Sequence, residues 1–369
     1  MKIGLVIYGS LETVSGGYLY DRKLVEFLRE RGDTVTLISL PWRNYARHLF
    51  DNIDQTWWRS CDLRAIDVLL EDELNHPSLI AFNRRMRGSI PIVSIVHHLR
   101  VSEHRPAWQN NIYCGIERAY LSTVDGFVFN SQTTRASVEQ LLGQAVAGVV
   151  ATPAGDRFSP RISAELIAAR AHEQGSLRVV FLGNVIARKA PHLLVQAMAV
   201  GGGDWTLTII GSEAVEPGYA HMIRELSSAL GVVTRIRWLG NATDRQVADE
   251  LASHHILAVP SSYEGFGIVY LEAMSFGLPV IAGTLGAARE IITPEVNGFL
   301  VAPGAAKDLA NKLGELEHDR AKLASMGMQA RTFFDHQPTW HDSMSRILAY
   351  LTSFLSGSQR SLQGPSRNF

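Results

Sequence analysis

Two glutamates and two glycines stand close together in residues 260–304, PSSYEGFGIVYLEAMSFGLPVIAGTLGAAREIITPEVNGFLVAPG. Glu264 lies in the turn after an apolar run, HILAVP, and Glu272 lies one turn into the predicted helix that follows. Gly265 and Gly267 let a ligand approach the backbone closely, and the N–H groups of a helix start bind anions. The arrangement suits a molecule that is anionic in the middle and rich in hydroxyls at both ends, which is the shape of a nucleotide-sugar.

The Glu-x7-Glu spacing, with its EGFG start, its PSS lead-in and the following GLPVIAG and NGFLVAPG, resembles the signature of family 4 retaining glycosyltransferases, which are glycosyl transferases of group 1. The alternative is an ordinary strand–turn–helix unit with a glycine-rich start and two solvated glutamates. The resemblance implies that Glu264 holds the hydroxyls of the donor sugar and that Glu272 holds the ribose diol. It also implies that the backbone amides of Phe266, Gly267 and Ile268 hold the diphosphate.

A second polar set follows a predicted strand in FLGNVIARKAP, where Arg188 and Lys189 come just before a helix. Cations there oppose the helix dipole, whereas a fixed cation would stabilise a departing diphosphate; the alternative is a solvated Arg–Lys pair. Counted from Gly183, Lys189 matches the diphosphate lysine of the resembled family. That family usually has arginine directly after the glycine, where this chain has Asn184. Either Arg188 supplies the second charge, or leaving-group stabilisation rests on Lys189 and the amides of 265–268.

The candidate groups of the first half are histidines and glycines. His97 and His98 end the predicted strand in IVHHLR, at the edge where open α/β sheets bind ligands, although isolated histidines are usually structural. Gly16 and Gly17 begin a predicted helix, where they either admit a phosphate or sugar or simply make a tight turn. The resemblance places a histidine beside the transferred sugar, with His97 the better match and His98 the reserve. It places the Gly16–Gly17 loop under the donor diphosphate and beside the acceptor.

The chain contains no Asp-x-Asp sequence, so the usual diphosphate site for a divalent cation is missing. The nearest acidic run, Glu71-Asp72-Glu73, closes a predicted strand, and we expect Glu73 to shape the acceptor side rather than to bind a metal. Because Arg188, Lys189 and helix starts stand in place of Mg²⁺, we expect a site that needs neither a metal nor a cofactor.

Residues 41–60, PWRNYARHLFDNIDQTWWRS, are rich in aromatic side chains and are amphipathic when placed on a helix. One face would carry Trp42, Tyr45, Leu49, Ile53 and Trp57, and the opposite face Arg43, Arg47 and Asp51. This composition is typical of interfacial helices, which would bring the chain into peripheral contact with a membrane or a lipid acceptor. The alternative is a helix that packs on its own sheet, or one whose Trp42 and Trp57 wall the acceptor site.

The bulk composition excludes several classes of protein. The chain has 369 residues, of which 46% are apolar, enough for two domains, and its net charge of -1 favours no contact with nucleic acid. No stretch approaches the roughly 20 apolar residues of a membrane span, and MKIGLVIYGS is too short for a signal peptide. Cys61 and Cys114 match no metal or redox spacing and suit a reducing compartment. We therefore expect a soluble, cytoplasmic protein.

Short apolar runs alternate with amphipathic segments, which is the βαβα pattern of parallel sheets covered by helices. The runs are KIGLVIY, TVTLISL, AIDVLLE, IPIVSIV, DGFVFN and AGVVAT in the first half, and LRVVFLG, WTLTIIG, RIRWLG, HILAVP and LPVIAG in the second. Between the halves, TPAGDRFSPR (152–161) contains two prolines and a glycine and is predicted to be the linker. The pattern predicts two Rossmann-like domains.

The resemblance covers nearly the whole chain and implies the GT-B architecture, in which two Rossmann-like domains face each other across a cleft and a last helix returns to the N-terminal domain. The predicted division is 1–155 for the acceptor-side domain, 156–335 for the donor domain, 336–355 for the returning helix and 356–369 for a disordered tail. Apolar side chains recur at helical spacing in the returning segment, at Trp340, Met344, Ile347, Leu348 and Leu351.

Three rival functions remain to be weighed. A dehydrogenase would need G-x-G-x-x-G after the first strand, but the first turn is GSLETVSGG. A protein that binds nucleotide-sugar without turnover is supported by Asn184 alone, and an epimerase or hydrolase would give products without an acceptor. We therefore expect a retaining, metal-independent glycosyltransferase that moves a sugar from a nucleoside-diphosphate sugar, with UDP favoured over GDP. Its acceptor would be a hydroxyl group in glycan, glycolipid or glycoside synthesis.

Overall fold

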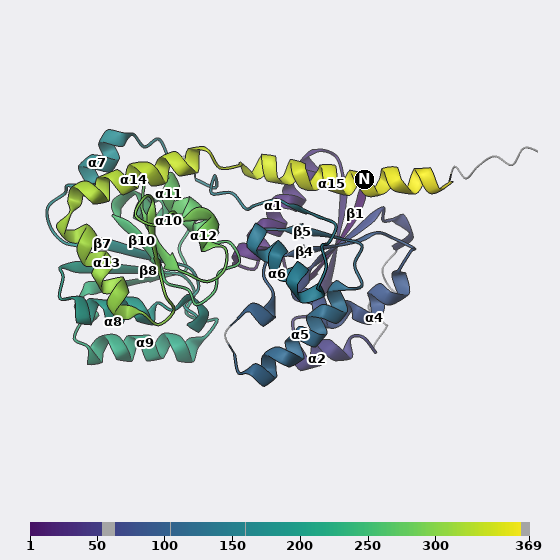
Figure 1. Cartoon of the computed structure of the whole chain (residues 1–369), viewed down its shortest axis with the longest axis horizontal. Coiled ribbons are helices and arrows are strands. Elements are labelled where there is room, and N and C mark those ends of the chain that lie inside the picture. The colour runs from purple at the N-terminus through teal and green to yellow at the C-terminus, as the bar shows by residue number, and fades with distance from the viewer. Residues whose placement is uncertain (54–62, 104, 159, 363–369) are drawn as a thin grey trace, which may run out of the picture. The chain divides into compact units, whose positions relative to one another are not determined.

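The computed structural model describes residues 1–53, 63–103, 105–158 and 160–362. They form two compact units: the first joins Met1–Pro153 to Trp340–Phe369, and the second is Ala154–Thr339 (Figure 1). Within this described part each unit contains a six-stranded sheet whose neighbouring strands are all parallel. The predicted α/β fold of two Rossmann-like domains is therefore confirmed.

The sheet of the first unit has the order β2-β1-β3-β4-β5-β6. Every residue of β3 and β4 is buried, as expected for central parallel strands covered on both faces. The strands are β1 (Lys2–Tyr8), β2 (Thr34–Leu40), β3 (Val68–Asp72), β4 (Ile92–Val96), β5 (Gly126–Phe129) and β6 (Gly148–Val150). The helices are α1 (Gly16–Glu30), α2 (Tyr45–Phe50), α4 (His76–Met86), α5 (Ala107–Leu121), α6 (Gln132–Leu142) and α15 (Trp340–Leu362), with short 3-10 turns at Leu63–Ala65, Glu73–Asn75 and Arg100–Ser102.

The sheet of the second unit has the order β12-β11-β10-β7-β8-β9. Its strands are β7 (Leu177–Leu182), β8 (Trp205–Ile210), β9 (Ile236–Gly240), β10 (Ile256–Val259), β11 (Val280–Gly283) and β12 (Gly298–Val301). Its helices are α7 (Ala164–Ala171), α8 (His192–Gly201), α9 (Pro217–Ala229), α10 (Asp244–Ser253), α11 (Ile268–Ser275), α12 (Ala288–Ile291), α13 (Ala306–His318) and α14 (Arg320–Asp335), with 3-10 turns at Ala187–Lys189 and Val233–Arg235. The chain order reverses between β7 and β10, which makes that pair the topological switch point of this sheet.

Helix α15 belongs to the first unit, as predicted, and packs beside α1 (Figure 1). Trp340 meets the ring of Tyr20 edge-on at 5.8 Å, and Ser343 Oγ donates to the Thr152 carbonyl at 2.6 Å. The helix continues to Leu362, beyond residue 355 where the sequence was expected to become disordered. Among the described helices, none combines the length and the apolar character needed to cross a membrane.

The helix predicted over 41–60 is much shorter in its described part. Asn44 caps the start of α2 by accepting from the Arg47 amide at 3.0 Å, and the helix ends at Phe50. Asp51, predicted on a solvated face, is buried because Ser78 Oγ and Arg43 Nη1 donate to its carboxylate at 2.7 and 2.8 Å. In its described residues, 41–53, the segment therefore contains a short helix tied to the first unit, and residues 54–60 of the prediction lie outside the described part.

Candidate active site

The carboxyl ends of β7 and β10 carry the residues predicted to bind the donor. Residues 183–189 follow β7, and residues 260–272 follow β10 and run into α11. Because these neighbouring strands form the switch point of the sheet, their connections leave on opposite sides, which is where open α/β sheets bind ligands. The topology thus brings two sequence-distant motifs to one edge of the second unit.

The two predicted cations converge on the first predicted glutamate. Lys189 Nζ lies 3.5 Å and Arg188 Nη1 lies 3.7 Å from Oε2 of Glu264. The side chain of Lys189 passes over Gly183, where a Cβ would come within 2.9 Å of its Cδ and Nζ atoms. Glycine at 183 is therefore what allows the lysine to lie against the end of β7 and reach the glutamate.

Arg188 is fixed from two sides. Its Nη1 donates to the Tyr263 carbonyl at 2.7 Å, and its own carbonyl accepts from the Ser262 amide at 2.8 Å. Arg188 thus stands beside Lys189 and ties the loop after β7 to the loop after β10. Asn184, which takes the place of the arginine usual in the resembled family, is half-buried at the end of β7.

The turn that carries Glu264 is held by backbone geometry. The Glu264 amide donates to the Leu285 carbonyl at 3.3 Å, and the Glu264 carbonyl accepts from the Ala287 amide at 2.9 Å. Gly267 begins α11 with φ of 97°, and a Cβ there would lie 2.2 Å from the Tyr270 ring. Glycine is therefore required at the helix start, whose first N–H groups have no partner within the helix.

Glu272 is 1% exposed and has a charged partner that the sequence analysis missed. Arg157 Nη1 lies 3.4 Å from Glu272 Oε1, and the same guanidinium donates through Nε and Nη2 to Asp244 at the start of α10. Burial raises the pKa of Glu272, and the charge of Arg157 opposes that rise. Arg157 lies in the predicted linker, far from Glu272 in the sequence, so no sequence pattern indicated that the two residues pair.

In the first unit, one face of α1 holds His97. A Cβ on Gly17 would lie 3.1 Å from Cδ2 of His97, the ring of Tyr20 meets the imidazole edge-on at 5.3 Å, and Asp21 Oδ1 lies 3.4 Å from Nε2. Positions 17, 20 and 21 share a face because their spacing is three and four residues. Gly17 and His97 therefore lie against each other, and the fully buried Asp21 is a further neighbour of the imidazole.

The acidic surroundings favour the charged form of His97. Burial opposes an imidazolium, but the carboxylate of Asp21 beside Nε2, together with the charges of Asp72 and Glu73, outweighs it and raises the pKa of His97 to about 9. Asn130 Nδ2 donates to the His97 carbonyl at 2.7 Å, which fixes the backbone of this residue as well. These charges favour the protonated ring, which would act as a hydrogen-bond donor rather than as a base.

We expect the Asp21→Asn variant to lower the pKa of His97 towards its ordinary value, because the substitution removes the charge nearest to the imidazole. Histidine ring signals followed by NMR from pH 5 to 10 measure this shift. His98→Gln is the control, because His98 pairs with Glu103 at 2.9 Å instead. If the pKa of His97 is the same in Asp21→Asn as in the parent chain, Asp21 is not the cause of the raised pKa.

Two groups of carboxyl and imidazole side chains meet inside the first unit, Asp21–Asp72–His97 and Glu73–His76–Glu117, each with its candidate ligand atoms within 4.8 Å of one another. Burial raises the pKa of Glu73 to about 7 and that of Glu117 to about 8, so both carboxyl groups take up a proton more readily than exposed glutamates do. Glu73, predicted to shape the acceptor side, is 4% exposed and lies among these side chains. Its role on the acceptor side stays a prediction.

The aromatic residues predicted on the acceptor side are only partly described. Trp42 is 62% exposed and touches Tyr8 edge-on at 5.7 Å. Phe50 and Ile53 are also largely exposed. Trp57 lies outside the described residues. The described part of the segment thus presents apolar surface to solvent, and the prediction of an acceptor wall stays a prediction.

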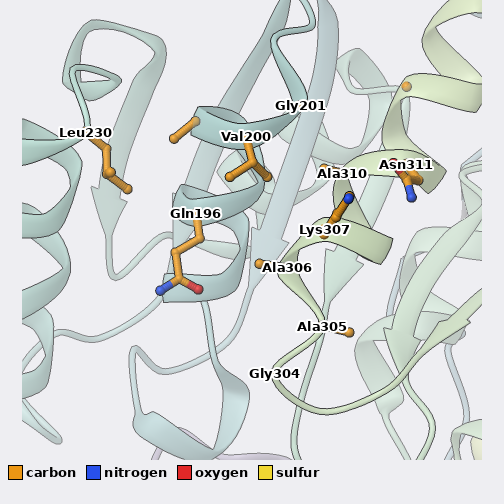
Figure 2. A pocket seen from close by; sticks show the side chains of 12 residues that line it. Gln196, Val200, Gly201, Leu230, Gly304, Ala305, Ala306, Lys307, Ala310 and Asn311 are labelled. Carbon is orange, nitrogen blue, oxygen red and sulfur yellow. The ribbon is translucent and has the colours of Figure 1, made fainter.

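A hollow of about 760 Å³ lies elsewhere on the second unit, between α8 and the start of α13. Gln196 and Val200 line it from one helix, and Lys307 and Ala310 from the other (Figure 2). Its lining residues are distinct from those at the ends of β7 and β10. Since the hollow has no carboxylate in its lining to hold sugar or ribose hydroxyls, it is a poorer donor site than the switch point.

Residues 163–333 match the family described as Glycosyl transferases group 1. The chain is 27% identical over 224 residues to a D-inositol 3-phosphate glycosyltransferase of Xylanimonas cellulosilytica, over 58% of this chain and 54% of the relative. It is 28% identical over 304 residues to a GDP-mannose-dependent alpha-(1-6)-phosphatidylinositol monomannoside mannosyltransferase of Mycobacterium tuberculosis, over 76% of this chain and 73% of the relative. The chain thus spans about half the length of the first of these curated relatives.

Solved structures of glycosyltransferases share the fold. Sucrose-phosphate synthase from Thermosynechococcus elongatus superposes with a TM-score of 0.81 at 19% identity, over 96% of this chain and 99% of the other. HepE from Anabaena in complex with UDP-glucose superposes with a TM-score of 0.75 at 21% identity, over 96% of this chain and all of the other. The GT-B architecture predicted from the sequence is thus confirmed at the level of the fold.

Proposed function

Because residues 163–333 match the group 1 glycosyl transferases, we propose that this chain is a retaining glycosyltransferase that uses a nucleoside-diphosphate sugar. The observation that carries the proposal is the convergence of Lys189 and Arg188 on Glu264 at the β7/β10 switch point. Glu272 stands one turn further along α11. This set offers cations for a diphosphate and carboxylates for hydroxyls on either side of it.

In the proposed reaction, the bond between the sugar and the diphosphate breaks while the acceptor hydroxyl attacks from the same face. The departing phosphate oxygen takes the proton of the acceptor, so no side-chain base is needed. Lys189, Arg188 and the amides at 266–268 would stabilise the charge that grows on the leaving group. Glu264 would hold the sugar hydroxyls and Glu272 the ribose diol. His97, as a protonated ring, would donate to the transferred sugar.

We propose that this chemistry proceeds without a divalent metal, because Lys189 and Arg188 offer two positive charges beside Glu264 that would neutralise a bound diphosphate. The test measures thermal stabilisation by UDP and by GDP in EDTA, followed by sugar transfer to an inositol-phosphate acceptor in the same buffer. Stabilisation and transfer in EDTA are expected, and transfer that returns only with Mg²⁺ would refute metal independence. Free sugar released without an acceptor would favour a hydrolase, and binding without any product would favour a binding protein.

The preferred nucleotide is proposed to be UDP. The HepE structures contain UDP or UDP-glucose, whereas the Mycobacterium tuberculosis relative is named for GDP-mannose. GDP is therefore the direct competitor in the binding experiment. The curated relatives named above act on inositol phosphate or phosphatidylinositol mannoside, so polyol and glycolipid hydroxyls are the first acceptors to supply.

We also propose peripheral contact with a membrane through the segment around α2. Phe50, the last residue of α2, and Ile53, in the turn after it, are 66% and 77% exposed, and Arg47 of α2 is exposed as well. Apolar side chains beside a cation favour shallow insertion into anionic lipid.

Phe50→Ser together with Ile53→Ser is expected to lower binding to vesicles of anionic lipid at low salt, because both apolar contacts are removed. Flotation of the chain with vesicles measures this. Val215→Ser with Val233→Ser, which removes exposed apolar groups of the second unit, is the matched control. Equal flotation of all three proteins would place any lipid contact elsewhere.

A further inference from the structure

The guanidinium of Arg157 is built into the second unit as a bridge between two carboxylates. It donates to Asp244 through Nε at 3.1 Å and through Nη2, and its Nη1 lies 3.4 Å from Oε1 of Glu272. The guanidinium also stacks over the ring of Phe158, with 5.0 Å between Cζ and the ring centroid, and Phe158 packs edge-on against Phe276. An arginine held by two carboxylates and an aromatic face has a fixed position.

The backbone beside Arg157 is packed tightly on α11. A Cβ on Gly155 would lie 2.5 Å from Cβ of Leu271 and 2.9 Å from the amide of Glu272. The segment that begins the second unit therefore lies directly on the helix turn that carries Glu272. The position of Arg157 relative to Glu272 is set by this packing rather than by the arginine side chain alone.

Glu272 is costly to keep charged at its position. It is 1% exposed on a helix whose described neighbours Tyr270, Leu271, Ala273 and Met274 are all buried and apolar or aromatic. An ionised carboxylate in such surroundings needs a paired charge, and without one it takes up a proton. A protonated carboxyl cannot accept hydrogen bonds from both hydroxyls of a diol as an anion does.

We propose that Arg157 is a positioning residue that keeps Glu272 ionised and oriented to accept both hydroxyls of the donor ribose. The inference rests on the proposed function, because it takes Glu272 as the ribose ligand. The charged groups that act on Glu272 are Arg157 itself, Asp244 on α10, which disfavours the anion, and Lys189 after β7, which favours it. Of these, Arg157 is the one with an atom within 3.4 Å of the carboxylate.

The sign of the pH effect follows from these charges. Burial raises the pKa of Glu272 and Arg157 lowers it, so removing the guanidinium raises the pKa further. The fraction of ionised Glu272 then falls as the pH falls, by up to about tenfold for each pH unit below the pKa. Loss of Arg157 is therefore expected to weaken nucleotide binding most at low pH and to spare it at high pH.

The experiment measures the affinity of the full chain for UDP, and for GDP in parallel, by calorimetry in EDTA between pH 5.5 and 9. Arg157→Gln is expected to bind at least tenfold more weakly than the parent chain at pH 6, with the difference shrinking as the pH rises. Arg157→Lys, which restores a cation, is expected to recover part of the loss. The 2′,3′-dideoxy nucleotide lacks the ribose diol, and we expect it to bind to Arg157→Gln and to the parent chain equally at every pH.

Two control variants test whether the loss of nucleotide affinity is specific to Arg157. Arg224→Gln removes another arginine of the same unit that pairs with a carboxylate, Glu213, through two nitrogens, and it is expected to bind like the parent chain. Glu225→Gln changes an exposed carboxylate of α9 that pairs with His221, and it is also expected to bind like the parent chain. Thermal melting of each variant without nucleotide establishes that it is folded.

The outcomes distinguish the inference from the function on which it rests. If the folded parent chain binds neither UDP nor GDP, the proposed function fails. If the parent chain binds and Arg157→Gln loses affinity equally at all pH values, or equally for the dideoxy nucleotide, Arg157 is a structural residue and the inference is overturned. Unchanged affinity in Arg157→Gln would overturn it as well.

Discussion

Replacing Lys189 by alanine is expected to lower the turnover of sugar transfer by roughly 100-fold or more, the loss typical of removing one preorganised group that stabilises transition-state charge. Lys189 is well suited to this role because it lies over Gly183 with Nζ 3.5 Å from Glu264. Arg188 cannot replace it fully, because its Nη1 is already engaged by the Tyr263 carbonyl at 2.7 Å. The measurement is the initial rate of transfer at saturating donor.

The matched control for this variant is Lys307→Ala, which removes an exposed lysine of the same unit at the hollow beside α13. It is expected to keep the turnover of the parent chain. Affinity for the intact donor should fall less in Lys189→Ala than turnover does, because negative charge builds on the leaving oxygen only as its bond to the sugar breaks. Turnover within twofold of the parent value would remove Lys189 from the leaving-group site.

Replacing Glu272 by alanine is expected to weaken binding of the nucleoside diphosphate by about 1.5–3 kcal/mol, the contribution of hydrogen bonds to a charged group. That is roughly a tenfold to hundredfold change in the dissociation constant. Calorimetry with the preferred diphosphate measures it. In this variant Arg157 still donates to Asp244, so the fold is expected to survive.

Glu225→Ala is the control for Glu272→Ala, because Glu225 is an exposed carboxylate of α9 that pairs with His221. It should bind nucleotide like the parent chain. Equal affinity of Glu272→Ala and the parent chain would mean that the ribose is held by other groups. That result would not affect the roles proposed for Lys189 and Glu264, which are tested by substitutions at those residues.

The strands were predictable because apolar runs in parallel sheets are local patterns. The predicted KIGLVIY and TVTLISL runs coincide with β1 and β2, and the other runs differ from their strands by a few residues at the ends. β12 (Gly298–Val301) was missed as a separate strand because it lies within the NGFLVAPG motif, which was interpreted as part of the family signature. The structure pairs it with β11 in parallel register.

Some residues of the candidate site could also be predicted from the sequence, and others could not. Lys189 and Glu264 could be predicted to meet because each follows a strand, and parallel strands bring their carboxyl ends to one edge. Arg157 could not be predicted, because it lies 115 residues from Glu272 in the chain and in a segment whose prolines and glycine indicate a linker. Asp21 was missed for a related reason, since a single carboxylate on a predicted helix gives no sign that a histidine packs against it.

The second unit is inserted into the first, which determines how the protein can be divided. The chain leaves the first unit at Pro153 and returns to it at Trp340, where α15 covers Tyr20 and Phe27 of α1. On a ribosome the second unit is therefore synthesised in full before the first unit receives its last helix. A chain cut once after Thr339 retains the complete second unit but exposes the apolar face of α1, so a single protease cut cannot release both units in their folded forms.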